Sequence, residues 1–170
     1  ISFQSAAYQA NTLREGNSNV REIDISLAKD QIRSESEAPF QESSGGVDLS
    51  TAEVLVSIGR GIGEESKIPI AEELASAMGA ELAASRPVVD SGWLPPFRQI
   101  GSSGQNVSPK LYFAVGISGA IQHVVGMKGS QNIIAINKDP EAPIFELADY
   151  AVVGDLHEII PKLTEALQSQ

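Results

Sequence analysis

The most constraining feature of the sequence is a series of short apolar runs that alternate with segments of helical spacing. Each run is followed by glycine or by polar residues, and the runs contain few charged side chains. Such runs are typical of strands that are buried on both faces of a parallel sheet. The runs lie at 54–58, 82–85, 111–115, 132–136 and 150–153.

The segments between these runs predict helices. Apolar residues recur at helical spacing from about Glu64 to Met78, and Gly79 is well placed to end that helix. Proline and glycine residues after the second run interrupt the regular pattern. The other expected segments are helices over 120–127, 145–148 and 156–167 and an irregular stretch over 87–98.

This alternation predicts an α/β fold with an open, doubly wound parallel sheet of about five strands. Parallel strands need crossover connections, and the crossover helices then cover both faces of the sheet. We expect residues 51–170 to form this domain. Residues 1–29, most clearly 20–25, alternate weakly as short half-exposed strands do, and residues 30–50 have the Ser-, Glu-, Gln- and Gly-rich composition of a linker.

Charge and composition exclude several classes of function. The 22 acidic residues outnumber the 12 basic residues, and a net charge of −10 repels nucleic acids and anionic membrane surfaces. The absence of cysteine excludes disulfides and thiolate chemistry, and two histidines cannot form a three-histidine metal site. No apolar run approaches the roughly 20 residues that span a bilayer. We therefore expect no metal, no nucleic-acid partner and no membrane insertion.

Ligands of such sheets bind beyond the carboxyl ends of the strands. The residues that follow the five runs are Gly59-Arg60-Gly61, Ser85-Arg86, Gly116-Ile117-Ser118-Gly119, Asn137-Lys138-Asp139 and Gly154-Asp155. Arginines, hydroxyls and glycines suit a ligand that carries phosphates and sugar hydroxyls. The pattern therefore predicts a nucleotide site.

Some of these residues also have structural interpretations. Asp155 is placed to cap the last helix, and Asp139 is placed to form a turn before Pro140. His123 is expected on the helix after Ser118, where a single histidine is more often a structural hydrogen-bonding group than a ligand-binding one.

Longer stretches resemble the C-terminal FAD-binding domain of the electron-transfer flavoprotein alpha subunit. The stretches that carry the resemblance are Gly59-Arg60-Gly61, SRPVVD at 85–90, LYFAVGISGAIQH at 111–123 and INKDPEAPIF at 136–145. The resemblance covers about 52–167. It implies an FAD/NAD-binding domain of the deoxyhypusine-synthase-like type, and it implies that residues 1–29 are the last strands of the alpha subunit's N-terminal domain.

The resemblance also implies which residues hold FAD. Family residues that match Arg60, Ser85 and Arg86 contact FAD, and the arginine that matches Arg86 lies against the isoalloxazine ring. The complete set implied is Arg60, Ser85, Arg86, Gln99, Ile100, Gly101, Ser102, Ser103, Gly116, Ser118, Gly119, Gln122, His123, Asn137, Asp155 and Leu156.

The resemblance implies which part of FAD lies beside five of these residues. Family residues that match Ser118, Gln122 and His123 lie along the pyrophosphate, the ribityl chain and flavin O2, respectively. Those that match Asn137 and Asp155 contact the adenosine half. The resemblance implies no catalytic residue.

The loop at 99–104 departs from the family pattern. Ser103 keeps the hydroxyl that lies near flavin N5 in the family, but Ser102 replaces a glutamine and Gln105 replaces a frequent lysine. These changes concern the tuning of the flavin ring rather than its binding.

The function implied is that of an electron carrier rather than an enzyme. It would take electrons from acyl-CoA or related dehydrogenases, as in fatty acid beta-oxidation, and pass them to a quinone oxidoreductase or another acceptor. An electron-transfer flavoprotein beta subunit would be its partner. No targeting signal is visible, so we expect the cytoplasm for a bacterial or archaeal protein and the mitochondrial matrix for a eukaryotic one.

Two alternatives remain open. Ser118, Asp139 and His157 occur in the chain order of α/β-hydrolase triads, although Gly116-Ile117-Ser118-Gly119-Ala120 lacks the second glycine of the nucleophile motif. A non-redox nucleotide-binding module would use the same kind of sheet.

Overall fold

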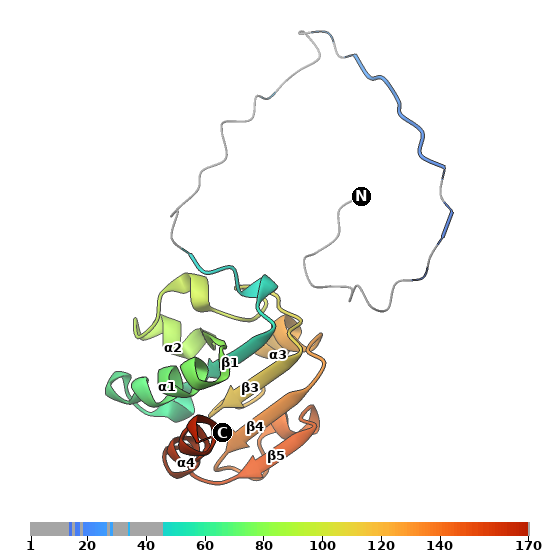
Figure 1. The fold of residues 1–170 in the computed structure, drawn as a ribbon. Coiled ribbons are helices and arrows are strands. Elements are labelled where there is room, and N and C mark those ends of the chain that lie inside the picture. Colours follow the sequence, from blue (N-terminus) through green and yellow to red (C-terminus); the bar gives the residue numbers. More distant parts are fainter. Residues whose placement is uncertain are drawn as a thin grey trace.

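One parallel sheet organises the folded part of the chain. The computed structural model describes residues 14, 16–17, 19–26, 28, 34 and 46–169 (Figure 1). Five strands pair in the order β2-β1-β3-β4-β5, all parallel, which confirms the predicted fold class. The strands and helices are β1 (Val54–Ile58), α1 (Pro69–Met78), β2 (Glu81–Ala84), α2 (Arg86–Asp90), β3 (Leu111–Val115), α3 (Ile121–Met127), β4 (Ile133–Asn137), β5 (Tyr150–Val153) and α4 (Leu156–Gln168).

The strand boundaries agree with the apolar runs to within one residue. β1, β3 and β5 have the predicted bounds, whereas β2 begins at Glu81 and β4 ends at Asn137. Glu81 pairs with Leu55, and Asn137 pairs with Val153. Each of these two strands therefore extends by one polar residue beyond the apolar run that predicted it.

The segment that was expected to be irregular begins with a helical turn. Arg86–Asp90 forms α2, so the prediction was wrong for this part. Pro87 lies in the first turn, where its missing N–H would have had no partner within the helix. Val88 is completely buried in the core, and its burial holds the turn against the sheet.

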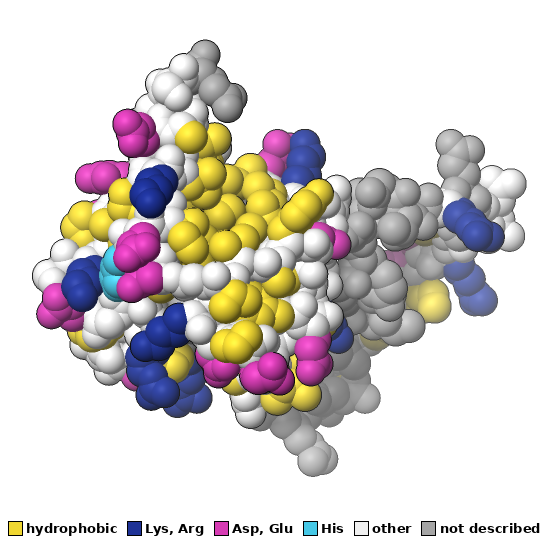
Figure 2. All heavy atoms as spheres, turned by 90° about the horizontal axis from the view of Figure 1, so that it is seen from below, with side chains coloured by type: hydrophobic (Ala, Val, Ile, Leu, Met, Phe, Trp, Pro, Cys, Tyr) yellow, Lys and Arg dark blue, Asp and Glu magenta, His cyan; other side chains and the backbone are white. Residues whose placement is uncertain are grey.

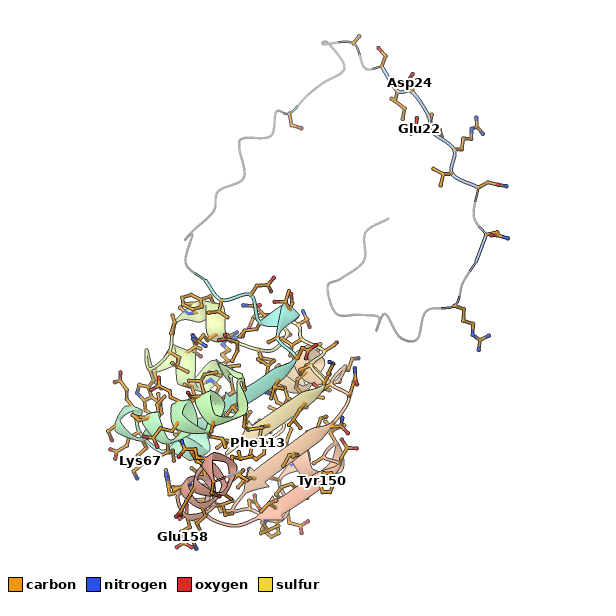
Figure 3. The ribbon with its side chains drawn as sticks, in the orientation of Figure 1. Glu22, Asp24, Lys67, Phe113, Tyr150 and Glu158 are labelled. Carbon is orange, nitrogen blue, oxygen red and sulfur yellow. The ribbon has the colours of Figure 1, made fainter. Side chains whose placement is uncertain are left out.

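Both faces of the sheet are covered. On one face α1, α2 and α4 pack on the strands, and Phe113 on the central strand lies among their apolar side chains (Figure 3). On the other face α3 and several short turns cover Tyr112, which is fully buried. The edge strand β5 is less protected, since Tyr150 is 67% exposed. Among the residues described, no helix is long and apolar enough to cross a membrane.

The folded domain begins slightly before residue 51. A short 3-10 helix, Leu49–Thr51, precedes β1, and Leu49 is completely buried. Its backbone N–H donates to Gln105 Oε1 at 3.0 Å. The end of the predicted linker is therefore part of the core.

No strand forms over 19–26, although 20–25 was expected to be the clearest strand of the N-terminal segment. Val20 and Ile25 are 89% and 76% exposed. A strand needs a hydrogen-bonded neighbour, and none of the described residues pairs with this segment. The other strands expected within 1–29 lie mostly outside the described residues.

Two glycine turns meet where β1 and β3 end. β1 leads to α1 on one face of the sheet and β3 leads to α3 on the other, so the chain diverges at this point. Gly59 N–H donates to the Val115 carbonyl at 2.8 Å, and Gly61 N–H donates to the Gly116 carbonyl at 3.0 Å. A Cβ on Gly61 would lie 2.7 Å from Gly116 Cα. Divergence of this kind between adjacent strand ends marks the usual ligand site of doubly wound sheets.

We expect Gly116→Ala to destabilise the domain more than Gly79→Ala. The two glycines have nearly the same positive φ, 62° and 61°, but only the Gly116 Cβ would contact the Gly61 backbone and the Leu156 side chain within 3 Å. Backbone strain costs each variant about 1–2 kcal/mol, and overpacking should add about 2 kcal/mol to Gly116→Ala alone. Urea unfolding measures both, and equal losses would contradict the packing argument.

Candidate functional site

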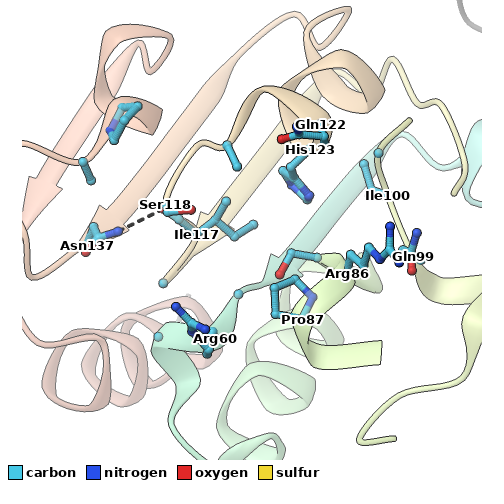
Figure 4. A pocket seen from close by; sticks show the side chains of 18 of the residues that line it. Arg60, Arg86, Pro87, Gln99, Ile100, Ile117, Ser118, Gln122, His123 and Asn137 are labelled. Atoms are coloured by element: carbon cyan, nitrogen blue, oxygen red, sulfur yellow. Dashed lines mark hydrogen bonds between the residues drawn. The ribbon is translucent and has the colours of Figure 1, made fainter. Parts of the chain in front are cut away.

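A cleft of about 770 Å³ lies at the carboxyl edge of the sheet (Figure 4). This volume is within the range of small-molecule and cofactor sites. Its walls are the turns that follow β1, β2, β3 and β4 together with the loop around residues 99–103. The cleft is thus built at the point where the two glycine turns meet.

The cleft brings together most of the residues that the sequence singled out. Arg60 and Arg86 lie on the side of the cleft opposite Ser118 and His123 (Figure 4). The predicted residues that line it are Arg60, Ser85, Arg86, Gln99, Ile100, Gly101, Ser102, Ser103, Gly116, Ser118, Gln122, His123 and Asn137.

Three predicted residues do not line the cleft. Asp155 caps α4, and its carboxylate accepts the His157 backbone N–H at 2.8 Å, as the structural interpretation predicted. Leu156 is buried in the core. Gly119 packs against the backbone of Ile144, where a Cβ would lie 2.2 Å from the amide nitrogen.

Sequence reasoning missed other residues of the cleft. Asp90 lines it because α2 places that carboxylate one helical turn after Arg86, and the i,i+4 spacing would have indicated this if the helix had been recognised. Ala142 and Pro143 also line it, and neither carries a chemical signal. Pro87 and Ala120 line it as well, and so do Gly59, Gly61, Ile117, Lys138 and Asp139, which the strand-end pattern had already indicated.

Positive charge gathers at the cleft although the chain as a whole is acidic. Arg60, Arg86 and Lys138 line it, and all three are exposed. Arg86 Nε contacts Asp90 Oδ2 at 3.2 Å, but both side chains are more than 60% exposed. An ion pair this exposed contributes at most about 1 kcal/mol, so Arg86 remains available to an anionic ligand.

Unused backbone donors lie in the turn after β3. The N–H groups of Ser118, Gly119 and Ala120 donate to no acceptor within the described part of the chain. Ser118 and Ala120 are exposed and line the cleft, so their N–H groups are open to an anion or a polar oxygen bound there. This turn therefore offers the hydrogen-bond donors that a phosphate-containing ligand needs.

The side chain of Asn137 connects two walls of the cleft. Its Nδ2 donates to the Ile117 carbonyl at 2.9 Å, and its Oδ1 accepts the Asp139 N–H at 3.0 Å. Asp139 in turn accepts the Glu141 N–H, which confirms the predicted turn before Pro140. Asn137 thus fixes the turn after β3 relative to the turn after β4.

Hydrogen bonds of both side chains and backbone hold the loop at 99–105. Gln99 Nε2 donates to Ser103 Oγ at 3.0 Å, and Ser102 N–H donates to the Gln122 carbonyl at 2.8 Å. Gln105 donates to the carbonyls of Val47 and Phe97 through Nε2. Gln105 is therefore a structural tie in this chain.

His123 is both buried and part of the cleft. It is only 6% exposed, and its Nε2 lies 2.8 Å from the Tyr112 hydroxyl, so the predicted structural hydrogen bond is present. Nδ1 is buried without a hydrogen bond. Burial lowers the pKa of His123 to about 4, and the nearby Ile100 carbonyl opposes this shift. The imidazole is therefore neutral at pH 7.

The hydrolase alternative lacks its base. Ser118 and Asp139 line the cleft, but His157 lies on α4 and does not. His123, which does line the cleft, is hydrogen-bonded to Tyr112 instead. No serine–histidine pair of the kind that activates a nucleophile is present among the residues described.

We expect the burial of His123 to make stability depend on pH. The folded pKa of about 4 lies below the unfolded value of 6.5, so the unfolded chain binds the extra proton between these values. The free energy of unfolding should therefore fall by about 2 kcal/mol from about pH 7.5 to about pH 5 because of this group. Urea unfolding should show this component in the wild type and in His157→Gln but not in His123→Gln. An unchanged pH slope in His123→Gln would contradict it.

Comparison with known proteins identifies relatives of this chain. A sequence model of the family described as "Electron transfer flavoprotein FAD-binding domain" matches residues 48–128. Electron transfer flavoprotein subunit alpha of Mycobacterium leprae is 53% identical over 123 residues, which is 72% of this chain and 39% of that protein. The subunit alpha of Paracoccus denitrificans is 55% identical over 120 residues, or 71% of this chain and 39% of that protein.

A longer match extends into the N-terminal segment. Protein FixB of Escherichia coli O127:H6 is 45% identical over 170 aligned residues, which cover 94% of this chain and 54% of FixB. The chain thus spans about two-fifths to one-half of the curated relatives it matches. The matched family model begins at Asp48 and includes the turns after β1, β2 and β3 that form the cleft. Residues 48–128 of this chain are thus similar to the family described as electron transfer flavoprotein FAD-binding domains.

Proposed function

We propose that the cleft binds FAD and that the chain is the flavin-binding part of an electron carrier. The observation that carries this proposal is the convergence of Arg60, Arg86 and the free N–H groups of Ser118 and Ala120 on one cleft in a chain of net charge −10. FAD carries two phosphate charges, and cations with backbone donors are the groups that hold phosphates. The family whose model matches residues 48–128 is described as FAD-binding.

The residues present fit this cofactor. Gly59, Gly61 and Gly116 let the turns after β1 and β3 meet at the floor of the cleft, because neighbouring backbone and the Leu156 side chain occupy their Cβ positions. Nδ1 of His123 is a buried polar atom without a partner beside the cleft. A cleft that combines apolar walls with a few polar groups of this kind is typical of a cofactor site.

Different residues would serve different parts of FAD. Arg60 and the turn at Ser118 supply charge and donors for the phosphates, whereas Arg86, Ser103 and His123 would adjust the surroundings of the flavin ring. The chemistry that FAD supplies when bound is reversible electron transfer. The chain itself binds and orients the cofactor and sets the charge around it.

A protein partner is part of the proposal. The relatives are named as alpha subunits, which supports a beta subunit as the partner of this chain. Figure 2 shows hydrophobic side chains gathered on one face of the molecule. Contiguous exposed apolar surface can mark a face that another chain covers. The large apolar side chains that are exposed in the folded domain are Ile121, Val125, Leu147, Tyr150 and Val153.

The electron donors and acceptors that we propose are those that the family resemblance implies. We infer that acyl-CoA or related dehydrogenases donate the electrons, as in fatty acid beta-oxidation, and that a quinone oxidoreductase or another acceptor receives them. The relatives described above are bacterial. Their source supports a cytoplasmic location for a bacterial chain of this family.

We expect the purified chain to bind FAD and to turn yellow. Arg86→Ala should weaken FAD binding about tenfold, because a charge-assisted contact is worth about 1.5 kcal/mol or more. Lys110→Ala is the matched control, since it removes one exposed positive charge at the opposite edge of the sheet, where Lys110 pairs with Glu53. Flavin fluorescence titration gives the dissociation constants.

Three outcomes would contradict the proposal or its mapping. An equal loss of affinity in Arg86→Ala and Lys110→Ala would show a general charge effect rather than a contact in the cleft. A colourless chain that FAD does not stabilise but NAD does would favour a non-redox nucleotide-binding module. Covalent labelling of Ser118 by a fluorophosphonate would favour a hydrolase.

A further inference from the structure

Two polar side chains form a hydrogen bond in the core beneath the cleft. Tyr112 on β3 is completely buried, and His123 on α3 reaches from the cleft toward it. The Tyr112 hydroxyl lies 2.8 Å from His123 Nε2, and the two ring planes are inclined by 59°. Tyr112 does not line the cleft, so its hydroxyl would affect a ligand through His123.

Burial keeps both Tyr112 and His123 in their neutral forms. Burial raises the pKa of Tyr112, which the Ser57 hydroxyl opposes to a smaller extent, so the phenol keeps its proton. The same desolvation keeps His123 neutral. A neutral imidazole has one N–H donor and one acceptor nitrogen. Nε2 therefore either accepts the tyrosine proton or donates its own to the tyrosine oxygen.

The acid–base strengths of the two groups select between these arrangements. A phenol O–H gives up its proton more readily than a neutral imidazole N–H, and the imidazole nitrogen is the stronger proton acceptor of the two groups. The ring proton therefore lies on Nδ1, which has no hydrogen bond within the described part of the chain. Nε2 then carries the lone pair, and the Tyr112 hydroxyl is its donor.

We propose that Tyr112 is a positioning residue whose O–H holds His123 as the neutral Nδ1–H tautomer, with its ring fixed at the floor of the cleft. The role toward a bound flavin rests on the proposed function, whereas the tautomer is a property of the chain alone. A fixed neutral ring presents a constant dipole to the cleft instead of a charge that varies with pH. Any ligand then meets an imidazole that is already oriented.

The tautomer can be measured directly. The chain has two histidines, so a ¹⁵N-histidine-labelled sample of the full chain contains two imidazoles, and His157 on α4 supplies the internal reference. Imidazole ¹⁵N shifts show which nitrogen carries the proton. We expect His123 to show a protonated Nδ1 and an unprotonated Nε2 at pH 7, with or without FAD. A protonated Nε2 in the wild type would overturn the proposal, and this result needs no variant.

Tyr112→Phe tests the role of the hydroxyl. Its loss should shift the Nε2 signal of His123, and it should weaken FAD binding about fivefold, which corresponds to one hydrogen bond of about 1 kcal/mol. Thr164→Val is the matched control, because Thr164 is also a buried hydroxyl but donates to Ile160 within α4. It should leave the His123 signals and the FAD affinity unchanged.

The two proposals fail in different ways. Unchanged His123 signals in Tyr112→Phe, or the same shift in Thr164→Val, would refute the positioning role. If the wild type binds no FAD, the proposed function fails, while the signals of the FAD-free chain still decide the tautomer. A shifted Nε2 signal with unchanged FAD affinity would refute the effect of Tyr112 on the cofactor.

Discussion

The contact between the turns after β1 and β3 is the constraint on which the site depends. Gly61 N–H donates to the Gly116 carbonyl, and neither turn has room for a side chain between the two backbones. This close approach fixes the ends of two central strands that lead to opposite faces of the sheet. The cleft opens above this point, with the ends of these two strands as its floor and with walls made of loops that carry the charged and polar groups.

Much of the fold could be predicted because β1 to β4 are largely buried and are therefore continuous apolar runs. The edge strand β5 is more exposed but is also an apolar run, and the predicted limits of all five strands agree with the structure to within one residue. Local signals were less reliable where proline is common. Pro87 permits both an irregular segment and the first turn of a helix, and only the burial of Val88 shows that α2 forms. Leu49 was overlooked because its burial depends on contacts distant in sequence.

The residues of the site fall into two similar groups: those that the sheet topology alone brings together, and those whose place depends on packing. Arg60, Arg86 and Ser118 follow strands directly, so the topology alone brings them to one edge. Asp155 also follows a strand, but β5 lies at the far side of the sheet and its carboxylate caps α4. Sequence could not reveal the bond between Tyr112 and His123, because it depends on how α3 packs over β3. Distance along the sheet and packing between elements therefore set the limit of prediction.

Gln105 joins the start of the domain to the wall of the cleft. Its side chain accepts the Leu49 N–H and donates to the Val47 carbonyl, while its backbone is hydrogen-bonded to Gln99 and Gly101. A single amide thus tethers the incoming polypeptide to the loop that lines the pocket. The backbone at Val47 and Leu49 and this wall of the cleft are therefore positioned by the same residue.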